Sequence, residues 1–140
     1  MKRVLGLLLA LCALCLCGCG DETADAAEVV ASAERALNVL EEAGYKVTFV
    51  TDADYLLQMS ANMNASGNVK VEHPLVAYLE GTNAITAGDD AIEIYAFTSR
   101  KDADCVAEYL VTEYLEQKYQ VYQTGCLVCI GTLEAIQVLK

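Results

Sequence analysis

The sequence predicts an α+β domain in which an antiparallel sheet of four to five strands carries its helices on one face. Three observations favour this class. Apolar residues recur every three or four positions over 26–43, which is the period of one face of a helix. In shorter segments such as 91–98, aliphatic side chains alternate with charged or aromatic ones, which is typical of a strand with one buried side. Gly44 and Gly125 lie at the ends of such segments and supply turns between them.

Capping residues set the bounds of the helices. Gly44 ends the first helix, because glycine readily adopts the left-handed conformation that follows a last helical turn. Asp52 or Asp54 caps the second, since a carboxylate accepts hydrogen bonds from the free N–H groups there. Ser99 with Asp102 resembles a capping box, with Asp in place of the usual Glu or Gln. The helices are predicted over 26–43, from the Asp52 or Asp54 cap to about 63, over 100–117 and from 132 onward.

Strands rich in β-branched and aromatic residues fill the intervals between the helices. They are predicted over 45–51, 75–80, 91–98, 120–123 and 126–130. The second and third form a hairpin, because Gly88-Asp89-Asp90 between them has turn chemistry. Without the first helix, the order is that of a ferredoxin-like split βαβ unit with one added strand and a closing helix. Right-handed crossovers would place the helices of such a unit on one side of the sheet.

The N-terminal segment carries a signal for export. Two basic residues precede an apolar stretch over 4–17, and Gly18 and Cys19 follow it to complete the run Leu16-Cys17-Gly18-Cys19. This run resembles a bacterial lipobox, and the resemblance implies cleavage after Gly18 and a diacylglycerol thioether on Cys19. The stretch is shorter than the roughly 20 residues of a spanning helix, although Gly18 and Cys19 extend it enough to leave an uncleaved anchor as an alternative. The chain then divides into a signal peptide over 1–18, a lipidated tether over 19–25 and a single domain over 26–140.

Lipidation implies a location on the extracytoplasmic side of a cell membrane, to which the N-terminal lipid holds the protein. The whole chain has a net charge of −11, and without the signal peptide it carries 7 basic and 20 acidic groups. This acidity excludes nucleic acid as a natural partner. It also predicts that the domain stands off from anionic lipid headgroups.

Three cysteines belong to the folded part of the chain: Cys105, Cys126 and Cys129. The last two have the CxxC spacing of redox and metal motifs. They lie in a predicted strand, however, where residues three apart point to opposite faces, and a zinc site needs about four ligands. His73 precedes Pro74 in a predicted turn, with no nucleophile near it in sequence. We therefore expect structural thiols and no cofactor, with a disulfide to Cys105 or a weak metal site as alternatives.

Tyrosine and glutamate gather on one side of the predicted hairpin. Strand alternation places Tyr78, Glu80, Glu93 and Tyr95 together, opposite the apolar side chains of the same strands. Aromatic residues are enriched at protein interfaces, which makes these four a candidate partner face. The alternative is that the first helix covers them.

The last third of the chain resembles uncharacterised small lipoproteins of Gram-positive bacteria. The resemblance rests on Ile92-Glu93-Ile94-Tyr95-Ala96-Phe97, on Ser99 with Asp102 and Ala103, and on Gly131-Thr132. It implies no known activity and no catalytic residue. The prediction is a membrane-anchored, non-catalytic binding or accessory module of the cell envelope, whose partner is an envelope protein or a small ligand. The alternative is a redox or metal-binding module that uses Cys105, Cys126 and Cys129.

Overall fold

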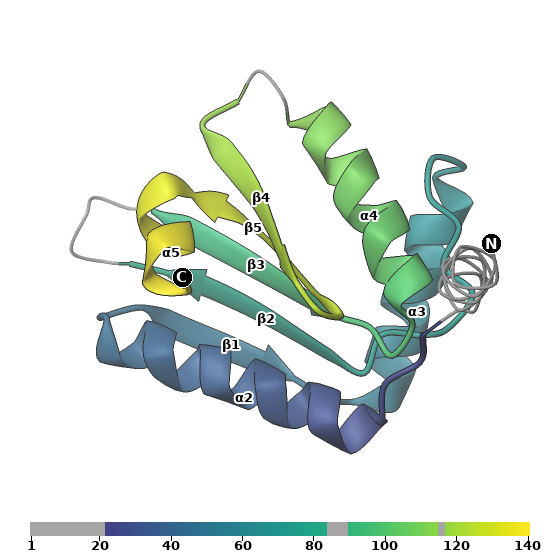
Figure 1. Cartoon of the computed structure of the whole chain (residues 1–140), viewed down its shortest axis with the longest axis horizontal. Coiled ribbons are helices and arrows are strands. Elements are labelled where there is room, and N and C mark those ends of the chain that lie inside the picture. The colour runs from purple at the N-terminus through teal and green to yellow at the C-terminus, as the bar shows by residue number, and fades with distance from the viewer. Residues whose placement is uncertain (1–21, 84–89, 115–116) are drawn as a thin grey trace, which may run out of the picture.

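The computed structural model describes residues 22–83, 90–114 and 117–140 (Figure 1). Its elements, in chain order, are α2 (Ala26–Glu42), β1 (Lys46–Val50), α3 (Ala53–Ala65), β2 (Ala77–Thr82), β3 (Ala91–Ala96), α4 (Arg100–Glu113), β4 (Tyr119–Thr124), β5 (Leu127–Thr132) and α5 (Leu133–Val138). The predicted helices and strands are all present in the predicted order. Most of the turn between β2 and β3, including Gly88 and Asp89, lies outside the described residues.

The predicted caps of α3 and α4 form where the sequence placed them, whereas Thr132, the cap expected for the last helix, makes no capping bond through its side chain. The Asp52 carboxylate accepts a hydrogen bond from the Tyr55 backbone N–H at 2.9 Å, at the start of α3. The Ser99 hydroxyl accepts one from the Asp102 backbone N–H at 3.2 Å, at the start of α4. Gly44 has a positive φ of 93° directly after the end of α2, as the left-handed turn requires. These helix bounds therefore follow from local chemistry.

The five strands form one sheet in the order β1-β2-β3-β5-β4, and all neighbours are antiparallel. The ferredoxin-like order is not confirmed. In a split βαβ unit the two strands joined through a helix are parallel and separated by another strand. Here β1 and β2 are joined through α3, yet they are direct antiparallel neighbours. The register pairs Tyr78 with Tyr95 and Glu80 with Glu93.

Helices cover both faces of the sheet, so the expectation of helices on one face is wrong. Side chains alternate along each strand, and they divide between two separate cores. Residues of α2 and α5 pack with one set, which includes Leu79, Ile94 and Cys129. Residues of α3 and α4 pack with the other set, which includes Tyr78 and Val128. Figure 1 shows α2 beside β1 at one edge and α4 near β4 at the other.

The N-terminal residues of the described chain are attached to the domain. The Ala24 N–H donates to the Thr98 carbonyl at 2.8 Å, and the Arg100 N–H donates to the Glu22 carbonyl at 3.0 Å. Thr23 also forms an antiparallel bridge with Ser99. Within the described ranges, the residues of the five strands and of both cores all lie at or after Ala24 in the chain. None of the helices within the described ranges is long and apolar enough to span a bilayer.

Candidate functional site

A groove of about 560 Å³ lies on the sheet face that α2 and α5 cover. One wall is a single face of α2, because its lining residues recur at helical spacing: Glu28, Val29, Ser32, Arg35, Ala36 and Val39. Leu127 and Cys129 of β5 line it as buried residues, 6% and 1% exposed. Tyr122 of β4, the end of α5, Ala24 and the hairpin residues Thr124, Gly125 and Cys126 also line it. Its volume falls in the range of about 300–1,000 Å³ that is usual for small-molecule sites.

The groove exists because α5 is short. A helix of six residues is about 9 Å long, whereas a strand of six residues spans about 20 Å. In this layer α2 packs mainly against β1, β2 and β3, whereas α5 packs against β3, β4 and β5. The end of the β4–β5 hairpin next to Gly125 therefore extends beyond α5, and the space above it becomes the groove.

Two cations lie at the groove in a domain that is otherwise acidic. The Arg35 guanidinium donates a hydrogen bond to the Ser32 hydroxyl at 2.7 Å. The Lys140 ammonium lies over the Tyr122 ring, 5.4 Å from its centre. Among the described residues neither cation pairs with a carboxylate, whereas Arg100 and Lys101 do. The groove thus offers positive charge beside an apolar lining.

No disulfide joins Cys105, Cys126 and Cys129 to one another in the described part of the chain. Cys129 is 1% exposed, and burial raises the pKa of its thiol from the ordinary 9.0 to about 12. A thiol with so high a pKa is a poor nucleophile at neutral pH, because nucleophilic attack needs the thiolate. Cys126 and Cys129 both line the groove, and Cys105 lies on α4 against the opposite core. The fold therefore separates Cys105 from the other two.

The four residues of the predicted partner face come together, but the centre of that face is closed. Both tyrosine hydroxyls donate to the Glu93 carboxylate, Tyr78 at 3.0 Å and Tyr95 at 2.8 Å. Burial and the neighbouring Glu93 raise the pKa of both tyrosines. Tyr78 is only 7% exposed, because it packs in the core beneath α3 and α4. The expectation of an open face is thus wrong at Tyr78, and it is α3 and α4, not the first helix, that cover it.

A smaller hollow of about 200 Å³ remains beside the closed part of this face. Glu80, Glu93, Tyr114 and Tyr119 are among its lining residues. Glu80 and Glu93 stand directly opposite each other in the β2–β3 register. Like charges in that position repel, and the two tyrosine hydroxyls offset part of the repulsion at Glu93.

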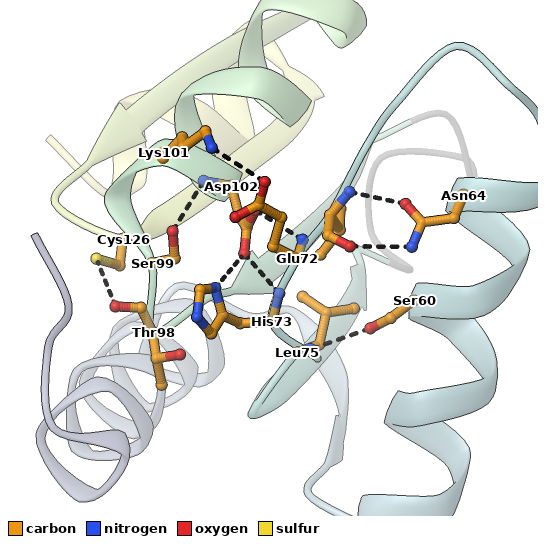
Figure 2. A network of polar contacts seen from close by, with 11 residues as sticks. Ser60, Asn64, Glu72, His73, Leu75, Thr98, Ser99, Lys101, Asp102 and Cys126 are labelled. Atoms are coloured by element: carbon orange, nitrogen blue, oxygen red, sulfur yellow. Dashed lines mark hydrogen bonds and ion pairs between the residues drawn. The ribbon is translucent and has the colours of Figure 1, made fainter. Parts of the chain in front are cut away.

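Asp102 is the centre of a buried polar network that the sequence did not indicate (Figure 2). Its carboxylate is 1% exposed and accepts hydrogen bonds from the backbone N–H groups of Glu72 and His73, both at 2.9 Å. The same carboxylate lies 3.0 Å from His73 Nδ1. Its backbone N–H plays the predicted capping role by donating to the Ser99 hydroxyl. The network fastens the 72–73 turn to the start of α4, and the Lys101–Glu72 ion pair at 3.0 Å reinforces it from the surface.

The predicted lipidation site, Cys19, lies outside the described residues. The chain matches no protein-family model, no curated protein and no solved structure. The site is therefore interpreted from its own chemistry. The apolar lining can hold a hydrocarbon, and Arg35 and Lys140 can hold an anion next to it. The sequence signal for the groove was weak, since the residues of α2 that line it look like the flank of an ordinary amphipathic helix.

Proposed function

We propose that the protein is an extracytoplasmic lipoprotein that acts as a non-catalytic binding module, with the groove between α2, α5 and β5 as its ligand site. The groove is the observation that carries this proposal, because its size suits a small molecule and its lining combines apolar side chains with two cations that lack carboxylate partners among the described residues. The lipobox at Leu16-Cys17-Gly18-Cys19 supports the anchor.

The burial of Cys129 and the remote position of Cys105 favour the binding role over the redox or metal alternative. The Cys129 thiol remains protonated at neutral pH, so Cys129 is poorly suited to be the attacking thiolate of a Cys126–Cys129 pair. Cys105 is remote from this pair, on the other side of the sheet.

Two measurements test the two parts of the proposal. The intact mass of the protein isolated from membranes should correspond to a chain that starts at a diacylglyceryl-modified Cys19. A mass that still includes residues 1–18 would contradict lipidation at Cys19 and would indicate an uncleaved N-terminal anchor.

The groove is tested with anilinonaphthalene sulfonate, a fluorescent probe that is apolar and anionic, on the soluble chain over 20–140. Ala36 lines the groove, so Ala36→Phe should fill part of it and weaken probe binding by about tenfold or more. Ala27 is exposed on the same helix and does not line the groove, so Ala27→Phe is the matched control. Equal binding by both variants would remove the groove as the ligand site.

A further inference from the structure

The attachment of residues 22–24 determines how close the anchor lies to the domain. Glu22, Thr23 and Ala24 are all joined to the segment Thr98–Arg100 through backbone hydrogen bonds or a bridge. Only three peptide steps separate Cys19 from Glu22. A fully extended chain covers at most about 3.6 Å per residue, so Cys19 lies within about 11 Å of Glu22 whatever its conformation. Of the predicted tether over 19–25, residues 22–24 are attached to the domain, so only the residues before Glu22 can act as a tether.

A lipid on Cys19 would hold one particular end of the domain against the membrane. That end carries Thr98 and Ser99. Cys126 lies at the same end, because its carbonyl accepts a hydrogen bond from the Phe97 N–H at 3.0 Å. Ala24, Gly125 and Cys126 also line the groove. The groove thus has one end beside the anchor, and the acidic domain can stand away from the headgroups by no more than this short tether allows.

The groove extends from that end along α2. Its lining on this helix runs from Glu28 to Val39, a rise of about 16 Å at 1.5 Å per residue. Arg35 lies seven residues beyond Glu28, and so farther along the groove. Lys140 lies over the ring of Tyr122, which is two residues away from Thr124 at the hairpin end of β4. The end near the anchor is therefore lined by small or apolar residues together with the polar Glu28 and Thr124, whereas Arg35 and Lys140 lie farther from the membrane.

This polarity matches a lipid of the outer leaflet, whose charged head also lies farther from the bilayer centre than its chain. We infer that the groove takes up a single-chain anionic lipid of the fatty-acid type from the adjoining membrane, with its chain toward Ala24 and Cys126 and its head group at Arg35 and Lys140. The inference rests on the proposed function, because it needs both the anchor and the groove. A single chain fits best, since the apolar strip is one helix face wide.

The test uses the lipidated protein in neutral phosphatidylcholine vesicles that contain a palmitic acid analogue with a diazirine at the chain end. After irradiation, peptide mapping should place the cross-links at the end of the groove near Ala24, Gly125 and Cys126. Labelling from the far end, around Val39 and Val138, would overturn the proposed orientation. A phosphatidylglycerol that bears the same chain, and labels as well as the acid does, would overturn the single-chain assignment.

The head-group site is tested with charge variants and a neutral probe. Arg35→Gln should lower the apparent affinity for the acid by about tenfold, as expected for loss of a hydrogen bond to a charged group. Lys46→Gln removes the same charge at an exposed position of β1 outside the groove and should leave labelling unchanged. The corresponding long-chain alcohol should bind the unmodified protein about as weakly as the acid binds Arg35→Gln. Equal labelling by acid and alcohol in all variants would reject the anionic head group, whereas failure of Ala36→Phe to weaken probe binding would reject the groove itself.

Discussion

The two faces of the sheet are covered by two helices each, yet one face is closed over its tyrosines and the other is hollowed. On the α3 and α4 face, residues between β2 and α3 fold over the core, and Asp102 fastens their turn to α4. On the α2 and α5 face, the short α5 leaves a groove beside β4, although the residues of β5 that line the groove stay buried. The two faces differ in the length of their covering helices, which is 13 and 14 residues for α3 and α4 on the closed face but only 6 residues for α5 on the hollowed one.

The largest expected difference between the faces concerns large side chains. Phe97 is fully buried on the α3 and α4 side, so Phe97→Ala should lower the free energy of unfolding by about 3–5 kcal/mol. Leu139 lines the groove and is half-buried, so Leu139→Ala should cost only about 1–2 kcal/mol. Urea denaturation of both variants measures the two values. Equal costs would mean that the groove is packed as tightly as the opposite core.

The Asp102 network should account for the next largest effect. Asp102→Asn keeps the size of the side chain but replaces one acceptor oxygen with an amide NH2 donor, so one of the two backbone N–H groups loses its acceptor. We expect a loss of about 2–3 kcal/mol in the free energy of unfolding. Asp104→Asn is the control, because Asp104 is exposed in its pair with Arg100 and should contribute less than about 1 kcal/mol. A loss no greater than that of the control would show that the network does not hold the turn.

The smallest expected effect is a loss of stability at alkaline pH, which comes from the buried thiol of Cys129 at the groove. Burial raises the pKa of the Cys129 thiol from 9.0 to about 12, so the folded state retains a proton that the unfolded state loses. This contribution is complete below pH 9 and is lost as the pH rises toward 12, at up to about 1.4 kcal/mol per pH unit.

Between pH 9 and 10 the protein should therefore lose about 1 kcal/mol more stability than Cys129→Ala does. Urea midpoints at the two pH values measure this difference. The buried tyrosines also lower the stability at alkaline pH, but their ordinary pKa of 10.0 lies above that of the thiol. Restricting the measurement to pH 9–10 therefore limits their contribution. Identical pH dependence in the two proteins would mean that Cys129 is not buried as described.

Sequence alone determined the elements of this fold and several of their contacts. The helical period over 26–43, the caps at Asp52 and Ser99 and the turn at Gly44 each depend on residues within a few positions of one another. The placement of Tyr78 and Tyr95 on the same side of the hairpin also followed, because side chains alternate along a strand.

Only the tertiary structure decided the strand order, the face that each helix covers, and the site. Asp102 meets His73 across 29 positions of the chain, and Asp90 meets the hydroxyls of Tyr45 and Thr132 across more than 40. The groove likewise joins α2 to the last residues of the chain. Such contacts depend on how the elements pack after they form, and nothing in the local period or the caps distinguishes one packing from another. The same physical reason explains why an amphipathic α2 was predictable and the hollow beside it was not.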